Sequence, residues 1–287
     1  MDSGEPMVRR FVLAALLAPF FAGVFGISTP LSAQWLKYPT AGVPRTPDGK
    51  PNLLAPTPRM RDGKPDLSGM WLTGDAPPCP PPNGSAAFID CGIELPISVL
   101  GFNMGAKTSG GLPFQPWAAA LVKKRTAENS KDDPHARCLP DTFLRAYGLP
   151  HIQKFIQVPG LLVMLDEVNA GYRQVFTDGR PLPVDPVPAW NGYSTAKWEG
   201  DALVIDSIGF RDDLWLDMAG SFITEKAKVQ ERIRRPDYGH LQIEATIDDP
   251  KAYTKPWTVT MNQRIVVDTE LVDEICLENE KSSQRMR

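Results

Sequence analysis

The chain has 287 residues, of which 42% are hydrophobic and 23% are charged, and its formal net charge at pH 7 is −3. This length is close to the upper size of a single all-β domain once an export signal is removed. The nearly balanced charge gives no support for binding to nucleic acid or to an anionic membrane surface, so we expect neither as a partner.

Residues 1–33 are predicted to be a cleaved signal peptide. Arg9 and Arg10 precede the apolar run FVLAALLAPFFAGVFGI, and Ala33 supplies a small residue before a cut at Gln34. A proline and several glycines in the run favour cleavage, so we expect no stable membrane anchor. The mature protein should therefore be periplasmic or secreted, although the arginines do not decide the export route.

In an exported chain, four cysteines favour disulfides over free thiols. Three connectivities are possible. Cys79 and Cys91 flank a short loop and are plausible partners, and a bridge from Cys138 to Cys276 would tie together the ends of the β-rich region. The chain contains no Cys-x-x-Cys, and its three histidines are scattered, so we expect no metal site.

Residues 34–131 are predicted to form an extended N-terminal strap with one helix. Thirteen of the 29 prolines lie between Pro39 and Pro96, which favours extended segments and turns laid over a sheet. LSGMWLT, from Leu67, alternates as a first strand does. Apolar residues at helical spacing after Pro116 predict the helix.

Residues 132–287 are predicted to form a β-barrel domain. From His151 onward, nine segments have strand composition: IQKFIQV, LLVMLDEV, YRQVFT, YSTAKWE, ALVIDSI, EKAKVQERIRR, HLQIEATI, WTVTMNQRIVV and LVDEIC. Short antiparallel strands in sequence favour an all-β, up-and-down barrel, because closure removes exposed edges. A two-sheet sandwich is the alternative.

The stretch from Tyr172 to Ile208 carries the clearest turn signals. Asp178-Gly179 and Gly200-Asp201 each predict a tight reversal between strands. Between them, four prolines keep a loop outside the sheet. We expect this loop to form the lip of a pocket, with three ligand-binding residues, Arg180, Trp190 and Tyr193. Packing of the two aromatic rings into the core is an equally good interpretation.

Four strands have an apolar face that is broken by one polar residue. Because side chains alternate along a strand, each polar residue should point the same way as its apolar neighbours. Inside a barrel they would converge on a partly apolar cavity that suits a small molecule, and they are Asp206, Glu231, Gln263 and Asp273. A one-residue error in register would instead send them to solvent.

A catalytic role for this cavity is a second interpretation. Asp206 and Glu231, if buried together, would differ in pKa and supply an acid and a base, and His240 could act as a base near neutral pH. A lone histidine after a turn is more often structural. Trp215, in the long loop from Gly209, could cap the cavity. No nucleophile elbow or zinc-protease motif is present, and no cofactor is expected.

Several blocks together resemble a large family of exported bacterial proteins of unassigned function. They are TDGRPLPVDPVPAWNGYS, KWEGDALVI, IGFRDDLWLD, ERIRRPDYGHLQIEATIDDPKAYTKPW and ICLENEK. The resemblance covers most of the chain from about Pro44 to Lys281. It implies export and a lipocalin-like β-barrel, but no activity, cofactor or catalytic residue.

Two functions follow from these observations. The first is binding of an apolar or amphipathic small molecule by an exported barrel. The alternative is a cofactor-independent hydrolase, lyase or isomerase that uses the carboxylates or His240. The sequence decides neither the ligand nor the oligomeric state.

Overall fold

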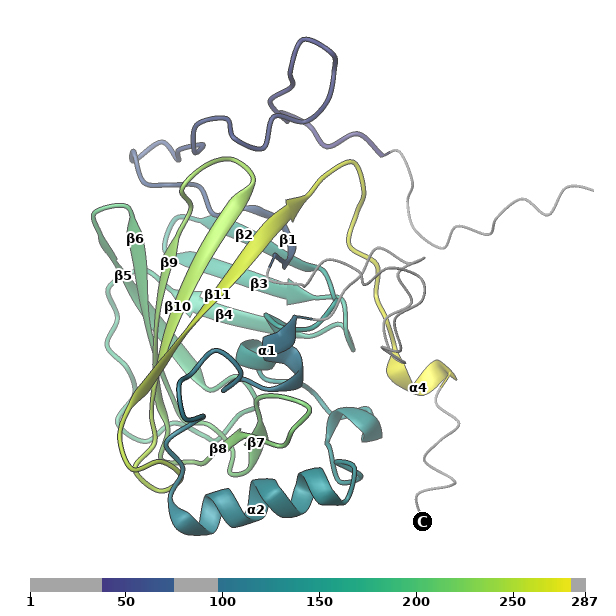
Figure 1. The fold of residues 1–287 in the computed structure, drawn as a ribbon. Helices are drawn as coiled ribbons and strands as arrows, with labels where there is room; N and C mark the ends of the chain where they lie inside the picture. The colour runs from purple at the N-terminus through teal and green to yellow at the C-terminus, as the bar shows by residue number, and fades with distance from the viewer. Residues whose placement is uncertain (1–37, 75–97, 280–287) are drawn as a thin grey trace, which may run out of the picture. The chain divides into compact units, whose positions relative to one another are not determined.

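The computed structural model describes residues 38–74 and 98–279 (Figure 1). The predicted signal peptide, residues 1–33, and two of the cysteines, Cys79 and Cys91, lie outside the described residues. In the described part of the chain, no helix has both the length and the apolar character that crossing a membrane requires.

Nine strands close into a barrel. Around it they run in the order β1 (Gly69–Thr73), β11 (Trp257–Val266), β10 (His240–Asp248), β9 (Lys228–Arg234), β6 (Ala202–Ile208), β5 (Tyr193–Glu199), β4 (Tyr172–Phe176), β3 (Leu161–Asp166) and β2 (Gln153–Val158), which pairs with β1 again. The protein is therefore mostly β, as predicted, and it forms a closed barrel rather than a two-sheet sandwich.

LVDEIC, the last of the nine segments predicted as barrel strands, forms no strand, whereas LSGMWLT, predicted as a first strand in the N-terminal segment, becomes part of the barrel. Residues 271–276 form no strand and contribute only an isolated bridge between Glu274 and Val168. β1 takes the ninth place and pairs with β11 through Trp71 and Ile265, among other residues. The segment after β11 carries less alternating apolar surface than β1, whose last four residues are all buried.

The sheet contains one parallel strand pair, and this pair follows from the path of the proline-rich loop. The predicted hairpin at Asp178-Gly179 does not form, because the chain leaves β4, crosses in residues 177–192 and re-enters beside it, so β5 pairs with β4 in parallel. Prolines cannot donate to a ladder, which prevents the loop from folding back on β4. At Gly200-Asp201 the predicted hairpin is present, and Gly200 has the positive φ of 61° that the reversal needs.

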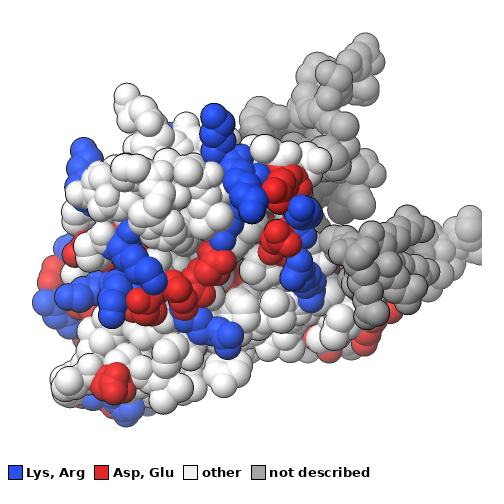
Figure 2. Space-filling model, turned by 90° about the horizontal axis from the view of Figure 1, so that it is seen from below, with Lys and Arg blue, Asp and Glu red and all other residues white. Residues whose placement is uncertain are grey.

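One helix covers an end of the barrel (Figure 1). It is the predicted helix, α2 (Pro116–Ala127), and it packs on a small sheet of β7 (Leu214–Trp215) and β8 (Phe222–Ile223). Arg125 of α2 lies 4.4 Å from the centre of the Trp215 ring. On the face that Figure 2 shows, basic and acidic residues lie next to each other rather than in a patch of one sign.

Four shorter helices accompany α2 among the described residues. They are α1 (Val99–Phe102), a 3-10 turn (His135–Arg137), α3 (Phe143–Ala146) and α4 (Cys276–Asn279). All four residues of α3 are buried. Tyr147 directly after α3 reaches the barrel interior, where its carbonyl accepts a hydrogen bond of 2.8 Å from Nε2 of Gln263.

Cys138 and Cys276 form a disulfide, one of the pairings that the sequence left open, with their Cα atoms 5.4 Å apart. The bridge joins the segment before α3 to the start of α4, which is separated from it by 138 positions in the chain.

Candidate functional site

The structure separates the four polar residues that were predicted to share the barrel interior. Glu231 and Gln263 are buried and face inward, at 0% and 2% exposure. Asp206 does not, because its strand buries Ser207 and Ile205 inward and turns Asp206 outward to accept a 2.9 Å hydrogen bond from Gln230.

Asp273 also lies outside the barrel. It is exposed, in the segment between β11 and α4, where no strand forms to turn it inward. The predicted convergence is therefore wrong for Asp206 and Asp273 and correct for the placement of Glu231 and Gln263.

Glu231 lies in a buried polar network. Its carboxylate accepts hydrogen bonds from Arg173 of β4, including one of 3.2 Å from Nη1, and a bond of 2.9 Å from the Tyr147 hydroxyl. Arg173 Nη2 also donates to Ser194 and Ser207, at 3.1 and 3.0 Å. A buried charge is tolerated only when it is paired and hydrogen-bonded. These bonds satisfy both Glu231 and Arg173 inside the barrel.

Burial and charge fix the protons of this network. Burial raises the pKa of the Tyr147 hydroxyl well above its ordinary value, and the charge of Glu231 raises it further. Burial lowers the pKa of Arg173, but Glu231 and Tyr147 outweigh it and leave that pKa raised. Tyr147 and Arg173 therefore both keep their protons at neutral pH. The network has a structural role rather than that of a proton relay.

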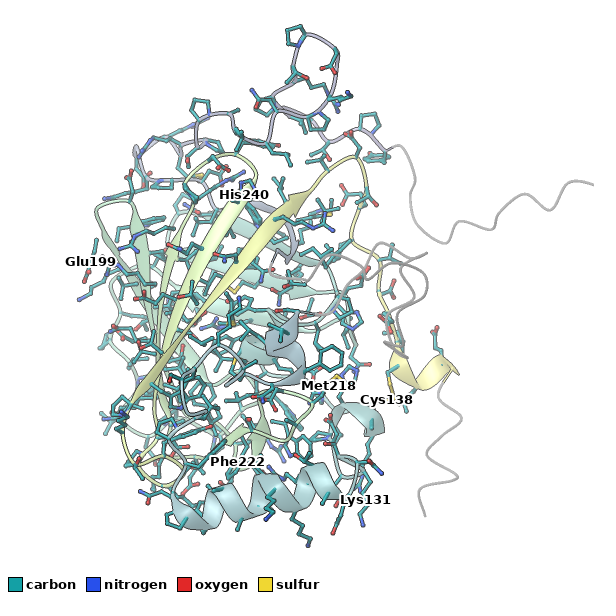
Figure 3. All side chains as sticks on the ribbon, viewed as in Figure 1. Lys131, Cys138, Glu199, Met218, Phe222 and His240 are labelled. Atoms are coloured by element: carbon teal, nitrogen blue, oxygen red, sulfur yellow. A yellow bond between two sulfur atoms is a disulfide. The ribbon has the colours of Figure 1, made fainter. Side chains whose placement is uncertain are left out.

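His240 and Trp215 also lie apart from Glu231. The His240 side chain is 45% exposed at the start of β10, with Nδ1 2.7 Å from Asp237, and Figure 3 shows it at the opposite end of the barrel from Phe222. Trp215 is 4% exposed and covered by Arg125. The predicted acid, base and cap are therefore not brought together, because Asp206 faces outward and His240 lies at the opposite end of the barrel from Phe222, the strand partner of Trp215.

A pocket of about 540 Å³ lies where β4 and β5 diverge. The ladder between these two strands is short, because they share only two registered pairs, Val175 with Ser194 and Phe176 with Thr195. The remaining walls come from the turn after β3, the loop before β5 and the segment around α3. Its main apolar side chains are Phe143, Met164, Leu165, Phe176, Trp190 and Tyr193.

Trp190 and Tyr193 both line this pocket, and Trp190 also packs against the hydrophobic core, so the two interpretations of the sequence do not exclude each other. Tyr193 stacks on Phe176, with ring centres 5.3 Å apart. Arg180 is exposed beside the same ring, 3.9 Å from its centre, and is ion-paired with Asp178. Trp190 of the proline-rich loop and Tyr193 at the start of β5 thus line the pocket, whereas Arg180, also predicted to bind the ligand, is not among the lining residues.

Two polar residues of the pocket were missed by the sequence reasoning. Gln153 of β2 and Asp166 of β3 are registered partners, and Nε2 of Gln153 donates to Oδ2 of Asp166 at 3.2 Å. Burial raises the pKa of Asp166 to about 6. The available signal was the charged residue that ends the apolar strand LLVMLD, directly before a turn.

A second polar cluster flanks the pocket. Asp141, which lines it, lies 2.6 Å from Nδ1 of His135, and this hydrogen bond raises the pKa of the imidazole. Arg145 forms two bonds of 2.7 Å to Asp133 and approaches Asp141 at 3.2 Å. Within residues 38–74 and 98–279, no group of three or more His, Cys, Asp or Glu side chains is arranged to hold a metal ion.

Comparisons of the chain with protein-family models, with curated proteins and with solved structures gave no match.

Proposed function

We propose that this is an exported barrel protein that holds an apolar or amphipathic small molecule in the pocket between β4 and β5. The observation that carries the proposal is the pocket itself: its volume of about 540 Å³ suits a small ligand, and aromatic and aliphatic side chains form most of its wall. Two of its aromatic residues, Trp190 and Tyr193, are those for which the sequence predicted a binding lip.

The location and the family resemblance are parts of the same proposal. The predicted signal peptide supports a periplasmic or secreted protein. The closed barrel is compatible with the lipocalin-like architecture that the resemblance implies, although the parallel β4–β5 pair departs from a simple up-and-down order. In this proposal the ligand lies beside the parallel pair, because the side chains of α3 and Tyr147 fill the neighbouring interior.

A cofactor-independent hydrolase, lyase or isomerase is the second candidate. One observation favours it: Asp166 lies in the pocket with a pKa raised to about 6 by burial, which suits a general acid or base near neutral pH. Asp166 would take the role that the sequence suggested for Asp206, Glu231 and His240. Recovery of a chemically altered ligand after incubation would support this candidate.

Binding of a neutral apolar dye, Nile red, tests the main proposal. We expect saturable binding with one dye per chain, and about tenfold weaker binding by Trp190→Ala, because the variant loses an aromatic wall. Trp117→Ala is the matched control, since Trp117 is 47% exposed on α2 and does not line the pocket. Native mass spectrometry of protein purified from its own periplasm identifies a co-purified ligand.

The proposal fails if Nile red does not bind in a saturable manner. It also fails if Trp190→Ala and Trp117→Ala have the same effect, because the dye then binds elsewhere.

A further inference from the structure

Gln153, one of the residues that line the pocket, carries an unsatisfied hydrogen-bond acceptor. Gln153 is 4% exposed, and its Oε1 is one of three buried side-chain polar atoms, among the described residues, that have no hydrogen-bond partner. The other two, in Arg145 and Trp257, do not belong to residues that line the pocket. A buried acceptor without a partner costs free energy, and a bound group that donates a hydrogen bond removes that cost.

The orientation of Gln153 is set by its neighbour. Its Nε2 donates to Oδ2 of Asp166 at 3.2 Å, so Oε1 is the amide atom left for another partner. Oδ1 of Asp166 accepts a bond of 2.9 Å from the backbone N–H of Val168. A carboxylate accepts about four hydrogen bonds, so Asp166 retains acceptor capacity beside the unpaired amide oxygen.

In the described part of the chain, Asp166 is a partly buried carboxylate without a cation partner. It forms no ion pair within the described residues, and the neighbouring charges that act on it, Asp141 and Glu167, are both negative. Asp141 has its own partners, His135 and Arg145. Burial of an uncompensated carboxylate is unfavourable, so a cation at this point is stabilised.

The one cationic residue that lines the pocket, Arg173, is already paired with Glu231. Arg173 is the only Arg, Lys or His among the residues that line the pocket, and its guanidinium is hydrogen-bonded to Glu231, Tyr147, Ser194 and Ser207. The charge of Glu231 balances that of Arg173, whereas no cation among residues 38–74 and 98–279 pairs with Asp166. The wall of the pocket is therefore mostly apolar, with a negative charge and free hydrogen-bond acceptors at Asp166 and Gln153.

We propose that the ligand is an amphipathic amine, whose ammonium group binds between Asp166 and Gln153 while its apolar body lies against Phe176, Tyr193 and Trp190. An ammonium group matches the site because it carries a positive charge and only donors. The inference rests on the proposed binding function and adds to it the chemical class of the ligand.

Three probes with one body and different heads test the inference. Phenylbutylamine, phenylbutanol and phenylbutanoate share the same apolar part, so differences in affinity report the head group. By calorimetry at pH 7.5, we expect the amine to bind about tenfold more tightly than the alcohol, and the carboxylate to bind most weakly. Equal affinity for amine and alcohol, or tightest binding of the carboxylate, overturns the inference.

Two variants test whether Asp166 causes the preference for the amine over the alcohol. Asp166→Asn keeps the shape and removes the charge, so the preference for amine over alcohol should fall to about threefold or less while the affinity for the alcohol is kept. Asp201→Asn is the control, because Asp201 is an exposed carboxylate paired with Arg59 outside the pocket. A preference that survives in Asp166→Asn overturns the inference.

The two proposals fail in different ways. If Nile red binds and none of the three probes does, the amine inference is overturned and the binding function stands. If neither Nile red nor any probe binds, both fall.

Discussion

Asp166 illustrates how a single residue links the pocket to the stability of the fold. Its pKa is raised from 3.8 to about 6 by burial, so the folded protein holds this proton more tightly than the unfolded chain does. Stability that depends on this group is therefore present below pH 4 and is lost as the pH rises through about 6. At neutral pH the ionised carboxylate opposes folding unless a cation is bound.

Replacement of Asp166 by Asn should therefore stabilise the protein at neutral pH. We expect Asp166→Asn to raise the free energy of unfolding by roughly 2 kcal/mol at pH 7.5 and to change it little near pH 4, where the wild-type group is protonated. Urea unfolding at both pH values measures the difference. Asp201→Asn, at an exposed ion pair, should leave the free energy of unfolding nearly unchanged at either pH. A loss of stability in Asp166→Asn at pH 7.5 contradicts the prediction.

Residue placement could be predicted where a strand has one apolar face. In β9 and β11, buried and exposed positions alternate, so the sequence placed Glu231 and Gln263 inside correctly. β6 is different, because Ala202, Leu203, Val204 and Ile205 are all buried and its two faces cannot be told apart by hydrophobicity. Asp206 was therefore assigned to the wrong face. Gln153 and Asp166 were missed because their pairing depends on the register between two strands.

At the scale of elements, the segment after β11 is held by a few specific contacts rather than by a strand ladder. The backbone of Glu274 bonds with Asn169, at 2.6 Å, and with Glu167, at 2.8 Å. Two residues after Glu274, the disulfide from Cys276 to Cys138 fixes the same segment. Because Asn169 lines the pocket, these contacts also position one of its walls.

Loss of this disulfide should destabilise the protein considerably. A loop closed over 138 positions contributes about 4 to 5 kcal/mol in the chain-entropy model, so Cys138→Ser and Cys276→Ser should each lower the free energy of unfolding by about that amount. The double variant should lose no more than either single one, since one bond is removed in all three. Urea unfolding measures the loss, and hydrogen exchange should increase at Asn169 and Glu274. A double variant within about 1 kcal/mol of the wild type contradicts the prediction.

Element type was easier to predict than pairing. The proline content of residues 177–192 indicated a loop outside the sheet, and the structure confirms it. The same sequence did not reveal that β4 and β5 pair in parallel, or that residues of both strands line a pocket. Local turn chemistry at Asp178-Gly179 favours a hairpin, but the path of a long loop is decided by tertiary packing.

At the scale of the whole barrel, closure depends on one short strand that precedes the other eight by a long stretch of chain. β1 pairs with both β2 and β11, so it satisfies two edges that would otherwise be open. Trp71 of β1 is fully buried, its Nε1 donates to the Leu67 carbonyl at 3.0 Å, and Arg235 lies 4.9 Å from the ring centre.

A chain that begins at residue 75 should therefore fail to form a stable monomer, whereas one that begins at residue 38 should unfold as cooperatively as the full chain. Without β1, the facing edges of β2 and β11 are exposed and available to other chains. Size-exclusion chromatography and urea unfolding distinguish the two. Trp71→Ala is a milder test within the intact chain, and we expect it to cost about 3 to 5 kcal/mol through the cavity that it leaves. A monomeric, cooperatively unfolding chain from residue 75 would show that the remaining strands close without β1.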